Sequence, residues 1–221
     1  MPYTVKVVTP PASRPVTAQE VKQQVGTDPD VGNNYVESVI DAVTRVCETY
    51  TRRAFITQTH ELILDRFPRR ERAEYPWWLD TALNFADAVR IPYPPLQSVD
   101  SVVTFDYDNQ TSTLDANAYF VNTRSEPGTI VPTQLNTWPT EVLPEAGVVI
   151  TYTAGYGDAA ADVPEPIRAA ITLEAAHYLS QTDPGITRES IDNASITYGE
   201  WNDQLLPAVK SALHPYRITK V

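Results

Sequence analysis

The hydrophobic period changes abruptly between residues 34 and 67, and this change constrains the fold most. From residue 36 onward, apolar side chains recur at the i, i+3, i+4 and i+7 spacing of one helix face. From Phe55 to Leu64 the chain is instead rich in β-branched and aromatic residues, which favour a strand. A long amphipathic helix therefore leads directly into a strand. The residues of its apolar stripe are Val36, Val39, Ile40, Val43, Val46, Cys47 and Tyr50.

The opposite change follows about a hundred residues later. Residues 147–153 are predicted to form a strand and residues 154–158 its turn, and Pro164 and Pro166 suit the first turn of a helix. Short strands and turns fill the interval. The predicted fold class is α+β, a small bundle of helices with an antiparallel β-rich insertion between the second and third helices. The predicted helices cover about 17–25, 33–53, 166–181 and 206–213.

The first helix has a clear start. Thr17 and Glu20 have the spacing of a capping box, and Val16 and Val21 that of a hydrophobic staple. The proline-rich segment before this helix predicts an extended arm. The predicted organisation is an arm over 1–15, a helical domain over 16–54 plus 162–214, an inserted β domain over 55–158 and a C-terminal tail over 215–221.

The charge of the chain limits its partners. With 17 basic and 28 acidic residues the net charge is −11, and the basic residues are scattered, which argues against a nucleic-acid-binding surface. The single cysteine excludes an internal disulfide. The N-terminal residues lack the pattern of a secretion signal, and no apolar run has the length of a membrane span. We therefore expect a protein made in a cytoplasm, without a membrane partner.

The sequence motifs that would indicate a catalytic site are weak or absent. His60, His177 and His214 lie in three separate elements without metal-ligand spacing, and the chain has no phosphate-binding glycine loop. Glu61 and Asp65 fall on one face of a strand, a position more typical of its solvated side than of an acid–base pair. The expectation is a protein that is not an enzyme, with no catalytic residue, no cofactor and no metal.

The long loop between residues 68 and 88 holds an aromatic group. Tyr75, Trp77 and Trp78 are of the types that dominate interface hot spots, which makes them candidates for a protein interface. Burial within their own subunit is the second interpretation, and the sequence does not decide between the two.

The order of these segments resembles the head-tail connector (adaptor) proteins of tailed bacteriophages and gene transfer agents. Each segment alone is weakly specific, but together they cover nearly the whole chain in the family's order. The matching segments are Val16–Lys22, Glu48–Thr59, Ile91–Val99, Tyr152–Gly157, Pro164–Ile171, Leu206–Val209 and Pro215–Arg217.

The resemblance implies a structural virion protein that forms a homo-oligomeric ring of about a dozen subunits. The ring would bind the portal protein on one side and a tail-side connector or stopper protein on the other. DNA would pass through it without specific binding. The implied location is the neck of a virion or phage-like particle, assembled in the bacterial cytoplasm. The residues before Val16 and the loop with Trp77 and Trp78 extend the family pattern.

Two further expectations concern contacts. In the family, C-terminal segments of this kind resemble the portal anchor, so the portal-contact candidates are Tyr216, Arg217, Ile218 and Lys220. The net charge of −11 suits the wall of a channel that should not hold DNA, and it requires subunit contacts that are apolar or locally paired, which we expect to be helix-to-helix.

The alternative function is a non-catalytic binding module. In it, the aromatic loop of the β insertion contacts a carbohydrate or a peptide. An enzyme of unknown type is the third alternative.

Overall fold

The chain forms two compact units in the computed structural model. The β unit comprises Met1–Ser13, Arg52–Asp158 and Ile218–Val221, and the helical unit comprises Arg14–Thr51 and Ala159–Arg217. The structure describes residues 3–25, 32–68, 87–133, 137–180, 188–191, 194–197 and 205–218, with the backbone alone for 188–191 and 194–197.

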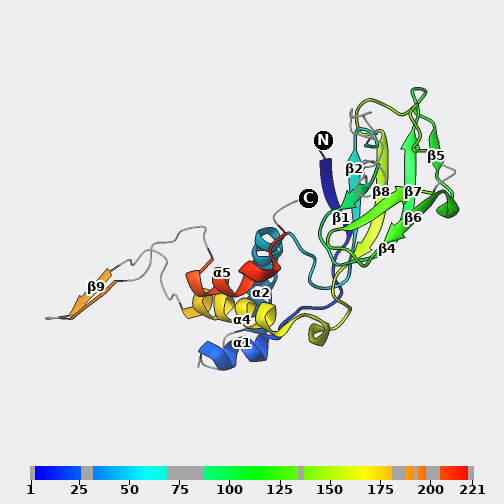
Figure 1. The fold of residues 1–221 in the computed structure, drawn as a ribbon. Coiled ribbons are helices and arrows are strands. Elements are labelled where there is room, and N and C mark those ends of the chain that lie inside the picture. The colour runs from blue at the N-terminus through cyan, green and yellow to red at the C-terminus, as the bar shows by residue number, and fades with distance from the viewer. Residues whose placement is uncertain are drawn as a thin grey trace, which may run out of the picture. The chain divides into compact units, whose positions relative to one another are not determined.

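A five-stranded antiparallel sheet forms one layer of the β unit (Figure 1). The expected strand after the long helix is β2, and the expected strand before the third predicted helix is β8. The two strands pair with each other along their whole lengths. Residues expected to form an extended arm are indeed extended, and they pair with β2 as the edge strand β1. In order across the sheet, the strands are β1 (Tyr3–Thr9), β2 (Gln58–Leu64), β8 (Val148–Ala154), β4 (Leu96–Phe105) and β5 (Thr111–Thr113).

A three-stranded antiparallel sheet forms the second layer. Its order is β3 (Val89–Ile91), β7 (Gly128–Pro132) and β6 (Tyr119–Asn122), and the 3₁₀ turn η1 (Ala116–Ala118) precedes β6. Residues of both sheets share one hydrophobic core, so the unit is a small β-sandwich. Central members of this core are Leu62, Ile91, Val102, Ile130 and Ile150.

Burial has a period of two in the interior strands β2 and β8, so one face of each strand packs on the core. In each strand every second residue is buried and the residues between are partly exposed. Gly155 follows β8 with φ of 138°, and a Cβ there would lie 2.6 Å from the carbonyl carbon of Ile56. Only glycine combines this backbone angle with this close approach, which confirms the predicted turn.

Four α-helices lie in the described part of the helical unit, close to the predicted positions. They are α1 (Ala18–Val25), α2 (Asn33–Thr51), α4 (Glu165–Ser180) and α5 (Pro207–Leu213), with the 3₁₀ turns η2 (Ala160–Asp162) and η3 (His214–Tyr216). Helix α4 contacts α1, α2 and α5 (Figure 1). None of these helices combines the length and hydropathy that a bilayer span requires.

The start of α1 forms as the sequence predicts. The Thr17 backbone N–H donates to Glu20 Oε2 at 2.6 Å, and the Glu20 N–H donates to Thr17 Oγ1 at 3.2 Å. These two bonds are the capping box. The bond from the Thr17 backbone N–H also lowers the pKa of Glu20, with further contributions from the Thr17 hydroxyl, which donates to Oε2 at 2.8 Å, and from Arg168 on α4, whose Nη2 lies 3.0 Å from Glu20 Oε1. The cap of α1 thus also joins it to α4.

A separate hairpin lies between α4 and α5. Strand β9 (Arg188–Ile191) pairs antiparallel with β10 (Ala194–Thr197), and the two form a sheet of their own. The sequence did not predict this pairing, because the segment is polar and lacks a clear period.

Candidate interaction surfaces

The C-terminal helix α5 is held by a buried carboxylate. Glu174 on α4 is 8% exposed, and its Oε2 accepts the backbone N–H of Leu206 at 3.0 Å. Leu206 stands at the N-cap of α5 and has no side-chain oxygen, so Glu174 supplies the missing cap from another helix. Val209 and Leu213 of α5 are fully buried. This short helix therefore has a fixed position on α4, and no local sequence pattern predicted its contact with Glu174.

Cys47 lies fully buried on α2. Burial, followed by the nearby carboxylates of Glu174 and Glu48, raises the pKa of its thiol to about 12. A thiol that stays protonated and buried does not act as a nucleophile. The expected packing role of Cys47 agrees with this position.

The candidate portal anchor begins on the helical unit. After α5 the chain makes the turn η3, and the Arg217 guanidinium carbon then lies 5.2 Å from the ring centroid of Tyr50 on α2. This is the geometry of a cation–π contact. Tyr216 and Ile218 are half-buried, and Lys220 lies outside the described residues. Three of the four anchor candidates thus continue directly from a fixed helix.

The aromatic candidates Tyr75, Trp77 and Trp78 lie outside the described residues. In the described part, the β unit has a different aromatic site that the sequence did not single out. The rings of Phe67 and Trp138 stack with centroids 4.3 Å apart, and Trp138 Nε1 donates to the Asp87 carbonyl at 2.6 Å. They line a small pocket with Arg66, Pro68, Tyr107, Pro139, Thr140, Val142, Leu143 and Pro144.

His60 lies in the core of the β unit. It is 2% exposed and stacks between Tyr93 and Tyr152, with ring centroids 5.4 and 5.3 Å away. Neither its ring nitrogens nor the Tyr152 hydroxyl has a hydrogen-bond partner among the described residues. Burial lowers the pKa of His60 to about 4 and raises that of Tyr152 above its ordinary value. His60 is therefore neutral at pH 7 and contributes to the core as a stacked ring.

The two acidic residues considered as an acid–base pair have separate roles. Glu61 is opposite Lys6 in the β1–β2 register, and Asp65 Oδ1 accepts the backbone N–H of Ala146 at 3.2 Å. His177 and His214 lie on α4 and at the start of η3. Within the described residues, no three His, Cys, Asp or Glu side chains are grouped closely enough to hold a metal ion.

Comparison with known proteins gives a match by structure. No protein-family model matches the sequence, and no curated protein matches it. Solved structures of gene transfer agent (GTA) particles do match. A chain from the neck of an empty GTA particle, computed with C6 symmetry, is 17% identical with a TM-score of 0.68, over 99% of this chain and 97% of that one.

Two further GTA structures give similar values. A chain from the virion of a native GTA particle is 17% identical with a TM-score of 0.68, over 99% of this chain and 97% of the other. A chain from the neck of a native GTA particle, computed with C12 symmetry, is 16% identical with a TM-score of 0.65, over the same shares. At these identities the likeness establishes the fold. Both units of this chain therefore have counterparts in a chain of a GTA neck, in agreement with the connector resemblance seen in the sequence.

Proposed function

We propose that this protein is a head-tail connector (adaptor), a structural subunit of a ring in the neck of a phage or gene transfer agent particle. The observation that carries the proposal is the likeness over 99% of this chain and 97% of a GTA neck chain, at a TM-score of 0.68. A match of this extent includes both the helical unit and the β unit. In the proposal, the helices form the body of the subunit and the β unit is an insertion into it.

The proposal of a ring rests on the symmetry of the similar neck structures. Two of the similar neck structures were computed with C6 and C12 symmetry, and closed cyclic symmetry is the symmetry of a ring. We propose about a dozen copies of this chain around a central channel, between the portal protein and a tail-side connector or stopper protein. The net charge of −11 gives the channel a surface that repels phosphate, so that DNA passes without being held.

The portal contact is proposed at the C-terminal tail, through Tyr216, Arg217, Ile218 and Lys220. The geometry supports this choice because Glu174 fixes the start of α5 and Arg217 contacts Tyr50, so the tail leaves the helical unit at a defined point. A short segment that begins on a rigid helix loses less entropy on binding than a free one.

Co-purification with the portal protein tests whether the C-terminal tail makes the portal contact. Deletion of residues 215–221 should leave the far-UV circular dichroism unchanged and abolish portal binding, because the deleted residues lie beyond α5. Arg217→Ala should weaken portal binding, while Arg124→Ala, which removes another exposed arginine from the β6–β7 turn, should not. Portal binding that survives the deletion would remove the tail from the proposal.

A second candidate function is the non-catalytic binding module. The observation that favours it is the aromatic pocket with Phe67, Tyr107 and Trp138, in which Tyr107 is 68% exposed. It predicts a monomer that binds a glycan or peptide and loses the binding with Tyr107→Ala. Electron microscopy of the protein mixed with portal separates the two functions, since portal-bound rings support the connector.

A further inference from the structure

Helix α2 has an uncharged outer face that the described residues of the chain leave exposed. Tyr35, Ala42, Val46 and Thr49 are spaced by seven, four and three residues, which places them on one side of the helix. All four are exposed, with 59% of Tyr35 and 47% of Val46 accessible. The core side of the same helix carries Val36, Val39, Ile40, Val43 and Cys47. We refer to Tyr35, Ala42, Val46 and Thr49 as the α2 face.

Helix α4 has a similar face. Pro166, Ala169 and Leu173 are exposed and spaced by three and four residues, so they too lie on one side of their helix. The buried residues of α4 lie on the other side, where the helix contacts α1, α2 and α5. A helix that is apolar on both sides has more apolar surface than its own unit covers. We refer to Pro166, Ala169 and Leu173 as the α4 face.

Several charged side chains of α1, α2, α4 and the segment before α1 pair with one another. Arg14 binds Asp41 at 2.7 Å and Glu37 at 3.1 Å on α2, and Arg168 binds Glu20 at 3.0 Å beside α4. Copies that each carry a charge of −11 repel one another, so a contact between them must avoid unpaired acidic groups. The two faces meet this condition.

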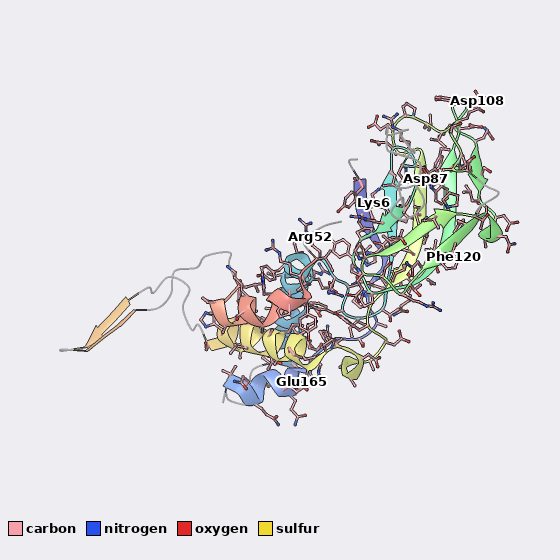
Figure 2. All side chains as sticks on the ribbon, viewed as in Figure 1. Lys6, Arg52, Asp87, Asp108, Phe120 and Glu165 are labelled. Atoms are coloured by element: carbon pink, nitrogen blue, oxygen red, sulfur yellow. The ribbon has the colours of Figure 1, made fainter. Side chains whose placement is uncertain are left out.

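The borders of the faces carry opposite charges. Arg45 is exposed beside the α2 face. Glu165 lies beside the α4 face at the start of the helix (Figure 2), and its side chain is 80% exposed although it pairs with Arg168 at 3.2 Å. With the α2 face of one copy against the α4 face of another, Arg45 and Glu165 can pair across the contact. The charges therefore favour a second copy of this chain as the occupant.

We propose that the α2 face of one copy packs against the α4 face of the next copy, and that this contact builds the ring. The proposal rests on the connector function and names the surfaces through which that ring forms. Because the two faces differ, each copy offers one to each neighbour, and such head-to-tail contacts close into a ring. Val46 and Leu173 would lie at the centre of the contact.

Cross-linking of portal-bound protein tests the contact. Val46→Cys combined with Leu173→Cys, treated with a short bis-maleimide, should give a ladder of covalent oligomers beyond the dimer. Native Cys47 gives little background because its thiol is buried, with a pKa raised to about 12. Each single variant should give no ladder. As a matched control, Val46→Cys with Phe120→Cys uses a residue 61% exposed on β6 (Figure 2) and should give none either.

A second pair, Ala42→Cys with Ala169→Cys, should also give the ladder, because each residue lies four positions before its partner in the first pair, Val46 or Leu173. Val46→Glu should reduce the fraction of protein in rings at least tenfold, whereas Phe120→Glu should leave it unchanged. Portal-bound rings that show no ladder with either pair would place the contact elsewhere while the connector function stands. Dimers formed by Val46→Cys alone would show face-to-face pairing and contradict the head-to-tail contact. Absence of wild-type rings on portal would remove the connector function itself.

Discussion

Strand β8 and helix α4 are both central to their units, but their apolar residues are buried to different extents. In β8 the buried residues Val148, Ile150, Tyr152 and Ala154 alternate with partly exposed ones, and the β unit covers the whole apolar side. In α4, Ile167 and Ile171 are fully buried while Leu173 remains 37% exposed. The difference teaches that apolar residues outside a helix core can mark a surface meant for another chain.

The largest effect expected from this comparison concerns the two sides of α4. Ile171→Ala should lower the free energy of unfolding by about 2 to 5 kcal/mol, because it removes a fully buried side chain. Leu173→Ala should lower it by only about 1 kcal/mol, because that side chain is 37% exposed and so buries less apolar area than Ile171. Urea denaturation of both variants measures the difference. Equal losses would show that the α4 face belongs to the core of the chain.

The next effect concerns the buried histidine of the β unit. Because the pKa of His60 is lowered from 6.5 to about 4, the unfolded chain binds a proton at a higher pH than the folded chain does. The contribution of His60 to stability is therefore complete above pH 6.5 and is lost as the pH falls toward 4. The loss should amount to about 3 kcal/mol.

His60→Phe separates this effect from the titration of carboxylates. Phenylalanine keeps a ring between Tyr93 and Tyr152 and has no proton to bind, so the variant should lose less stability than the wild type between pH 6.5 and 4. Thermal melts of both proteins across this range measure the difference. Parallel pH profiles would show that His60 is not the group that titrates.

The smallest effect concerns the start of α1. Thr17→Ala should cost about 1 kcal/mol, because the Glu20 N–H then loses its bond to Thr17 Oγ1. Thr123→Ala, at an exposed residue after β6, is the matched control and should change stability by less than about 0.5 kcal/mol. Urea denaturation can resolve this difference. A cost for Thr17→Ala no larger than that of the control would contradict the capping role.

Local patterns predicted much of the fold. The helices, the capping box of Thr17 and Glu20 and the turn at Gly155 depend on neighbours within a few residues, so the sequence contains their signals. The pairing of β1 with β2 joins residues at least fifty positions apart and has no local signal. The period of α2 was correct, but it assigned Val46 to the buried stripe, and this prediction was wrong because Val46 is 47% exposed.

The candidate sites were less predictable. The Glu174 carboxylate accepts the N–H of Leu206 at the start of α5, thirty-two residues later in the sequence. The stacked rings of Phe67 and Trp138 are likewise brought together only by the fold. The tail was predicted from a family resemblance, which gave its residues but not the contact of Arg217 with Tyr50. Sequence periodicity identifies apolar faces, whereas it does not say which of them the same chain will cover.

Cryo-electron microscopy of the full-length protein bound to its portal tests the central claim most directly. We predict a closed ring in which α2 of each copy lies against α4 of its neighbour. Single copies scattered on the portal, or a ring whose neighbours touch only through their β units, would contradict the claim.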